Sequence, residues 1–252
     1  MKLVAFCESA GDFRLVSGLV DRVLRESGPA WVVDGLETPE VIRTWQPDGL
    51  GRAYFDVHRL DTYVDKLKVR VLHGHFDGRP GGAGALMART AFLIVRALHR
   101  QAPDEPIEAI VLVWDVDVQS ENRPAGVKAA RDEARRWAPF QIICGFPDPE
   151  REAWVLAGFE PCDDDEQTCL EALRRELGFS PVLQAVELRA KQPGHPRDIK
   201  RVLRELTRGD HEREERCWTE PALETLRARG KDTGLAAFLA EVDEILVPRF
   251  KR

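Results

Sequence analysis

The chain has 252 residues, of which 43% are hydrophobic and 32% charged, and its formal net charge is −6. That length and apolar content allow a substantial core, in one large domain or in one domain with a smaller companion. The negative charge argues against a surface that is basic throughout, and no apolar run approaches the ~20 residues of a transmembrane helix.

Strand and helix signals alternate over the first 99 residues. Continuous apolar runs predict strands that are buried on both faces, and apolar residues three and four positions apart predict helices. The segment 37–66, which holds Pro39, Pro47, Gly49 and Gly51, fits neither pattern and is interpreted as an insertion. We expect strands at 2–7, 31–33 and 68–72 and helices at 13–24 and 85–99.

The alternation continues to residue 144, and helix signals dominate after it. A strand at 109–114, a helix at 125–137 and a strand at 140–144 complete the pattern, which predicts an α/β domain over residues 1–158 with a mostly parallel sheet flanked by helices. Residues 159–252 are expected to form a mainly helical region packed on that domain. Helix-start signals lie at 148–150 and 163–166, and further helices are expected at 197–206, 221–229 and 235–246.

Acidic residues follow two of the predicted strands. Glu8 comes directly after the first, and Asp115 and Asp117 come after the strand at 109–114. The carboxyl ends of parallel strands face a shared crevice, so these three side chains are expected to meet there. Three neighbouring carboxylates cannot all stay ionised without a cation, and hard divalent ions prefer oxygen ligands. The sequence therefore predicts a site for one or two Mg²⁺ or Mn²⁺ ions.

The spacing of these acids resembles a known family. Glu-Ser-Ala-Gly-Asp at positions 8–12, together with the later Asp-x-Asp, resembles the Toprim domain of topoisomerases, primases and overcoming-lysogenization-defect (OLD) nucleases. The resemblance covers roughly the first 150 residues. Ser9 departs from it, because the family commonly has Gly after its Glu, which bears on how closely a substrate approaches this turn.

A second resemblance concerns residues 146–157, which include Glu-Ala-Trp-Val-Leu-Ala. This segment, with 195–200 and 229–235, is similar to segments of small stand-alone Toprim-like proteins of the RloB-like group, often encoded beside an ATPase in bacterial defence loci. The two resemblances imply a Toprim/Rossmann-like fold and a metal-dependent nuclease acting with an ATPase partner in anti-phage defence.

The resemblances also imply roles for single residues. Glu8, Asp115 and Asp117 would be the metal ligands and catalytic acids, with Glu152 or Glu121 as a further acid. Lys200 and Arg197 would contact phosphate, and Lys200 would also serve catalysis. Ser9 and Asp12 would lie against the nucleic-acid substrate. A homodimer is compatible with this family, although no segment of the sequence indicates an interface.

Other interpretations of the same residues remain open. Glu152 fits a first-turn acid that complements a helix dipole equally well, and Trp154 fits core packing. Between Arg189 and Arg208 seven basic residues outnumber two acids, which fits a solvated helix face or a phosphate-binding patch. The glycine-rich stretch 79–84 lacks the ending of a P-loop, and His73-Gly74-His75 lacks further zinc ligands at familiar spacing.

Two alternative functions also remain. One is a non-catalytic Toprim-like regulator of an ATPase partner. The other is a phosphatase of the haloacid-dehalogenase type, in which Asp115 would attack phosphorus. DNA and RNA are equally compatible as nuclease substrates.

The cysteines and the first residues indicate the compartment. The five cysteines are scattered and show no C-x-x-C spacing, which favours free thiols under reducing conditions. The first apolar run ends at Glu8, too early for a signal peptide. We therefore expect a cytoplasmic protein.

Overall fold

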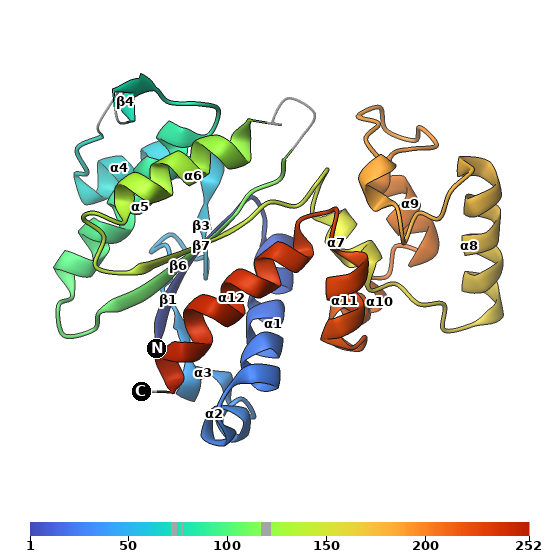
Figure 1. The fold of residues 1–252 in the computed structure, drawn as a ribbon, viewed down its shortest axis with the longest axis horizontal. Coiled ribbons are helices and arrows are strands. Elements are labelled where there is room, and N and C mark those ends of the chain that lie inside the picture. Colours follow the sequence, from blue (N-terminus) through green and yellow to red (C-terminus); the bar gives the residue numbers. More distant parts are fainter. Residues whose placement is uncertain (72–74, 77, 117–121, 252) are drawn as a thin grey trace.

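The computed structural model describes residues 1–71, 75–76, 78–116 and 122–251. Within these residues a five-stranded parallel sheet forms the centre of the fold (Figure 1). Its strands are β1 (Lys2–Cys7), β2 (Thr44–Trp45), β3 (Phe55–Asp56), β6 (Ile107–Val113) and β7 (Gln141–Gly145). β6 lies between β1 and β7, while β2 and β3 pair with the other side of β1 at its start and its end. Apart from this sheet, β4 (His75–Phe76) and β5 (Arg79–Pro80) form an antiparallel pair.

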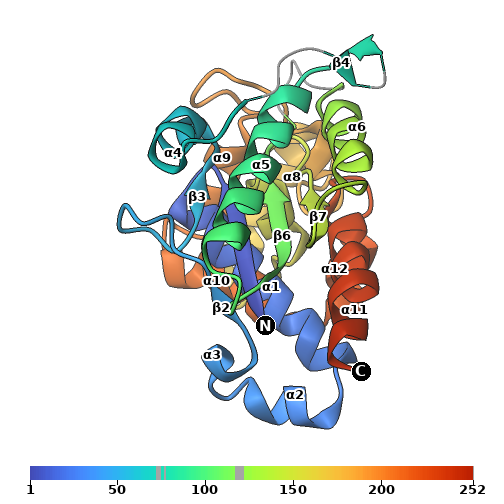
Figure 2. The same cartoon turned by 90° about the vertical axis from the view of Figure 1, so that its left-hand side faces the viewer.

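Helices cover both faces of the sheet (Figures 1 and 2). One face is covered by α4 (Leu60–Leu67), α5 (Ala85–Gln101) and α6 (Arg123–Ala134), and the opposite face by α1 (Ala10–Ser27) and α12 (Leu235–Phe250). Short helices α2 (Ala30–Gly35) and α3 (Pro39–Ile42) follow α1, and the 3₁₀ turn η1 (Val57–Arg59) precedes α4. The sheet is thus the middle layer of three, as expected for an α/β fold.

The two cores explain why the strands are apolar throughout. Leu3 and Ala5 of β1 belong to the core shared with α1 and α12. Val4 and Phe6, which alternate with them, belong to the core shared with α4, α5 and α6. Because successive side chains of a strand point to opposite faces, a central strand needs apolar residues at every position. β6 and β7 follow the same rule, which confirms the strands predicted at 2–7, 109–114 and 140–144.

The C-terminal half is helical, as expected. Its helices are α7 (Glu152–Ala157), α8 (Asp164–Leu177), α9 (Ile199–Leu206), α10 (His211–Thr219) and α11 (Leu223–Arg229), with the 3₁₀ turn η2 (Ala185–Glu187) between α8 and α9. Trp154 of α7 is fully buried, stacks on Phe238 of α12 at 5.0 Å and donates a hydrogen bond to the Thr233 carbonyl at 2.7 Å. The interpretation of Trp154 as core packing is therefore confirmed, while the boundary at residue 158 stays a prediction.

Two of the predicted strands are absent from the described residues. Residues 31–33 lie in α2, where the Val32 and Val33 N–H groups donate to the Pro29 carbonyl. Only Val32 is buried there, and Trp31 is 56% exposed, so the apolar triplet does not form a strand with two buried faces. In 68–72, Lys68 ends α4 with a φ of 53°, residues 69–71 have no regular structure, and Leu72 lies outside the described residues.

The segment 37–66 differs most from its interpretation. It carries β2 and β3, which form one edge of the sheet, and η1 and α4, which help cover one face. Each of the two strands has only two residues, too few to show the alternation that marks a strand. The segment is therefore part of the sheet and its cover.

Helix positions also differ in the second half of the chain. α7 begins at Glu152, four residues after the signal at Asp148, and the Asp148 N–H instead donates to the Thr233 carbonyl at 3.1 Å. No helix is predicted at 211–219, where α10 lies. Over the described ranges, no helix is both long and apolar enough to cross a bilayer.

Candidate functional site

Glu8 and Asp115 lie at the same edge of the sheet. Glu8 directly follows β1, Asp115 comes two residues after β6 ends, and these strands are parallel neighbours. The helices that follow the two strands, α1 and α6, pack on opposite faces of the sheet. Where the connections from two neighbouring strands lead to opposite faces of a sheet, a crevice is left at the carboxyl ends of the strands. The structure therefore places the two predicted acids at the position where α/β folds bind ligands.

A cavity of about 290 Å³ occupies this position. It is lined by Glu8, Ser9, Asp12, Asp115, Arg151, Glu152 and Lys200. All of these except Arg151 are predicted site residues. Asp117, Glu121, His73 and Gly74 lie outside the described residues.

Ser9 and Asp12 form the start of α1. The Ser9 hydroxyl accepts a hydrogen bond from the Asp12 N–H at 3.2 Å, and the Asp12 carboxylate accepts one from the Ser9 N–H at 2.8 Å. This reciprocal pair is a capping box, which satisfies two N–H groups that the first helical turn leaves free. The two residues predicted to contact substrate thus hold the turn that carries Glu8.

Arg151 lies among the carboxylates of the cavity. Its guanidinium is 3.4 Å from Asp12, 3.2 Å from Glu152 and 3.8 Å from Glu214. A cation at this position offsets the repulsion between acids that the fold brings together. No sequence pattern singles out Arg151, because its partners Asp12 and Glu214 are distant along the chain.

The pKa of the Asp115 carboxyl is strongly perturbed. Burial raises the pKa of its carboxyl to about 9, helped by the negative charges of Glu8, Asp12 and Glu152. The carboxyl group therefore holds its proton at neutral pH unless a cation arrives. Its backbone is fixed by Arg123, which donates a hydrogen bond to the Asp115 carbonyl and stacks over the Trp114 ring at 4.2 Å.

Glu152 and Lys200 come from the helices of the C-terminal half. Glu152 is the first residue of α7 and only 8% exposed, so it is both a first-turn acid and a lining residue of the cavity. Lys200 lies in the first turn of α9, 2.8 Å from Glu150. Burial alone would lower the pKa of Lys200, but the hydrogen bond to Glu150 and the charge of Glu152 raise it. Lys200 is thus a firmly protonated cation at the rim.

Arg197 lies elsewhere. Its guanidinium is over the Phe179 ring, 5.5 Å from the centroid, and the residue is exposed. It does not line the described cavity, so a contact between Arg197 and phosphate would involve substrate that extends beyond the site.

His58 is a cavity neighbour that the sequence did not predict. Its Nε2 atom is 3.1 Å from Oε1 of Glu8. The pairing of Cys7 in β1 with Asp56 in β3 brings them together, since each follows the end of one of these strands. No local pattern could have shown this, because β3 has only two residues.

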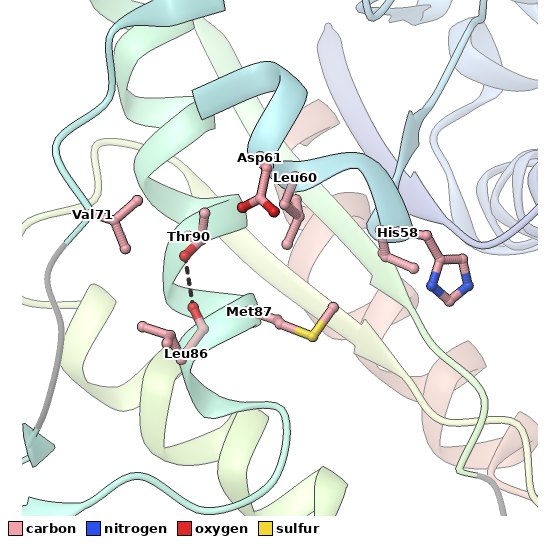
Figure 3. Close-up of a pocket in the computed structure, with 8 residues that line it drawn as sticks. His58, Leu60, Asp61, Val71, Leu86, Met87 and Thr90 are labelled. Atoms are coloured by element: carbon pink, nitrogen blue, oxygen red, sulfur yellow. Dashed lines mark hydrogen bonds between the residues drawn. The ribbon is translucent and has the colours of Figure 1, made fainter. Parts of the chain in front are cut away.

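A second cavity adjoins His58 (Figure 3). It has a volume of about 430 Å³ and lies between η1, α4 and the first turns of α5. Figure 3 shows His58 at one end and Val71 at the other, with Leu86, Met87 and Thr90 presented by α5. The lining is mostly apolar, unlike that of the acidic cavity.

The donor chemistry of the acidic cavity suits a hard divalent cation. Its described acids are Glu8, Asp12, Asp115 and Glu152, and oxygen ligands of this kind are those of Mg²⁺ and Mn²⁺. The proton held by Asp115 is further support, since a cation would replace it. These residues fit such an ion. Their oxygen atoms lie farther apart than the possible ligand atoms of a second group, which is described next.

That second group is formed by Cys162, Asp163 and Glu166. Each of these three side chains offers one atom that could bind a metal, and in the described part of the chain these atoms lie within 4.8 Å of one another. Its oxygens are already used: Arg213 binds both Glu166 oxygens at 2.7 and 2.9 Å, and Arg208 binds Asp163 at 2.8 Å. Asp163 also caps α8. The group is therefore an ion-pair cluster, in agreement with the interpretation of 163–166 as a helix start.

The cysteines are free, as expected: Cys7, Cys144 and Cys217 are buried, whereas Cys162 is exposed and Cys169 half-buried.

Neither a protein-family model, nor a curated protein, nor a solved structure matches this chain. Its function is therefore argued from the site itself.

Proposed function

We propose that this protein is a metal-dependent nuclease of Toprim type, which cleaves phosphodiester bonds in DNA or RNA. The observation that carries the proposal is the convergence of Glu8, Asp115 and Glu152 with Lys200 in one cavity at the carboxyl ends of β1 and β6. Acids that hold a divalent ion beside a cation that binds phosphate are the two components that phosphoryl chemistry needs.

Each side chain has a role in this proposal. Glu8 and Asp115, with Asp117, would hold one or two Mg²⁺ or Mn²⁺ ions, which when bound polarise the phosphate and activate water. Asp115 would release its proton when an ion binds. Lys200 would neutralise phosphate charge, and Arg151 keeps Asp12 and Glu152 in place.

An ATPase partner belongs to the proposal because of the charge of the chain. A net charge of −6 opposes binding to a polyanion, and the cations of the cavity are already ion-paired, Lys200 with Glu150 and Arg151 with Asp12 and Glu152. A partner that binds nucleic acid and presents it to the cavity would remove this obstacle. Together with the resemblance to Toprim-like defence proteins, this supports an effector that acts with an ATPase against phage.

A non-catalytic regulator is the second candidate, and Arg151 favours it. The guanidinium already sits among the acids of the cavity, so Asp12 and Glu152 have a cation without any metal. In that case the cavity would be a structural ion-pair cluster, and the protein would act by binding its partner.

The test is cleavage of supercoiled plasmid and of tRNA with Mg²⁺ or Mn²⁺. The wild type is compared with Glu8→Gln and Asp115→Asn, and Asp104→Asn, an exposed residue before β6, is the matched control. Metal-dependent cleavage that the two site variants lose and the control keeps supports the nuclease. If calorimetry detects no binding of Mn²⁺ to the wild type and cleavage is absent, the nuclease proposal fails and the non-catalytic regulator is preferred.

A further inference from the structure

His58 is held beside Glu8 by well-defined contacts. The Asp56 side chain accepts a hydrogen bond from the His58 N–H at 2.9 Å, and the Tyr63 hydroxyl accepts one from the Asp56 N–H at 3.1 Å. Tyr63 is fully buried and fixes this turn to α4. Since Asp56 pairs with Cys7 in the sheet, the backbone positions of His58 and Glu8 are set by the same pair of strands.

The distance between the two side chains also matches the separation of two ligands of one metal ion. The His58 Nε2 and Glu8 Oε1 atoms are 3.1 Å apart. Two neighbouring ligands of an octahedral ion, each ~2.1 Å from it, are about 3 Å apart. The imidazole and the carboxylate are therefore separated as two ligands of one ion would be, without any movement of the backbone.

We propose that His58 is a ligand of the same divalent ion as Glu8, and that its nitrogen makes the site prefer Mn²⁺ to Mg²⁺. The inference rests on the metal site of the proposed function and goes beyond it, because neither the acidic motifs nor the resemblance includes a histidine. Mg²⁺ prefers an all-oxygen environment, whereas Mn²⁺, a softer ion that begins the Irving–Williams order, accepts one imidazole nitrogen beside carboxylate oxygens more readily.

The location of His58 supports this assignment over a purely structural ion pair. The side chain of His58 is 60% exposed and that of Glu8 21% exposed, so their contact stabilises little of the core. His58 lines the apolar cavity of Figure 3, and Glu8 lines the acidic cavity, so their contact links the linings of the two cavities.

The test is electron spin-echo spectroscopy of the protein loaded with Mn²⁺, which detects a nitrogen nucleus bound to the ion. The wild type and His58→Ala are compared, and His211→Ala, an exposed histidine at the start of α10, is the matched control. We expect nitrogen modulation in the wild type and in the control, and none in His58→Ala. We also expect His58→Ala to lower Mn²⁺ affinity by roughly tenfold or more, with a smaller effect on Mg²⁺ affinity.

Two outcomes would overturn the inference, and they are distinguishable. If the wild type binds Mn²⁺ and Glu8→Gln weakens the binding, but nitrogen modulation is absent or survives in His58→Ala, then His58 is not a ligand and the carboxylate site stands. If the wild type binds no Mn²⁺, or if Glu8→Gln and Asp115→Asn leave the binding unchanged, the proposed metal site fails and the role of His58 fails with it. Circular dichroism of each variant is the check that the fold is intact.

Discussion

Replacing Asp115 by Asn tests the electrostatics of the cavity without using nuclease activity. The pKa of this carboxyl is raised from 3.8 to about 9, mainly by burial and then by neighbouring acids. Between these values the folded protein binds a proton that the unfolded chain does not bind. The contribution of Asp115 to wild-type stability should therefore be complete below pH 4 and should fall as the pH rises towards 9.

The expected magnitude follows from proton linkage. One proton costs about 1.4 kcal/mol per pH unit, so between pH 5 and pH 8 the loss from Asp115 is about 4 kcal/mol. This is an upper limit, because water that enters an open cavity solvates the ionised carboxylate. Asn cannot ionise. The stability of Asp115→Asn relative to the wild type should therefore increase with pH by up to about this amount.

Urea unfolding with EDTA at pH 5, 6, 7 and 8 measures the difference, with Asp104→Asn as the control that should follow the wild type. Adding Mn²⁺ should reverse the order, because an ion at 100 times its Kd stabilises the wild type by about 2.7 kcal/mol and Asp115→Asn by much less. If wild type and Asp115→Asn stay parallel over this pH range within about 0.5 kcal/mol, Asp115 does not hold a proton in the cavity and the argument for a cation there loses its electrostatic support.

Three further predictions concern the fold and the chemistry. Arg213→Met should destabilise the protein by about 3 kcal/mol in urea unfolding, because it leaves buried Glu166 without its two hydrogen bonds from Arg213. These bonds, with a third from the Cys162 N–H, hold the pKa of this carboxyl at about 2 against the effect of burial. An unchanged midpoint would refute this. Gly158→Ala should cost about 2–3 kcal/mol, since its Cβ would lie 1.7 Å from the Cys217 carbonyl oxygen, and a melting temperature equal to that of the wild type would contradict the packing. Lys200→Ala should slow plasmid nicking about 10- to 100-fold and leave Mn²⁺ affinity nearly unchanged in calorimetry; equal nicking rates would remove Lys200 from the site.

The central strands and the position of the acids were predictable from the sequence. β1, β6 and β7 are buried on both faces, and that burial requires the continuous apolar runs by which they are recognised. Glu8 and Asp115 directly follow such runs, and the geometry of a parallel sheet then places them at one edge. For these residues the pattern along the chain is enough to predict the position in the fold.

The remaining parts of the site depend on contacts between distant segments. β3 exists because Phe55 pairs with Phe6, and without this strand nothing along the chain relates His58 to Glu8. α10 is mostly polar and only partly buried, so it lacks an apolar face by which it could be recognised. Arg151 lies among acids because α1 brings Asp12 to it and α10 brings Glu214. Sequence patterns describe a residue and its neighbours along the chain, and these features are set by neighbours in space.

The charges around the acidic cavity bear on how many ions the proposed site would hold. Four lining carboxylates, those of Glu8, Asp12, Asp115 and Glu152, face two cations, Arg151 and Lys200, which leaves a charge of −2 when every acid is ionised. Glu214 and Glu150 are ion-paired with the same two cations and bring the charge to −4. Two divalent ions would balance this charge, whereas one ion together with the proton on Asp115 would leave −1. The charge of the described residues therefore fits one or two ions, the number expected from the sequence.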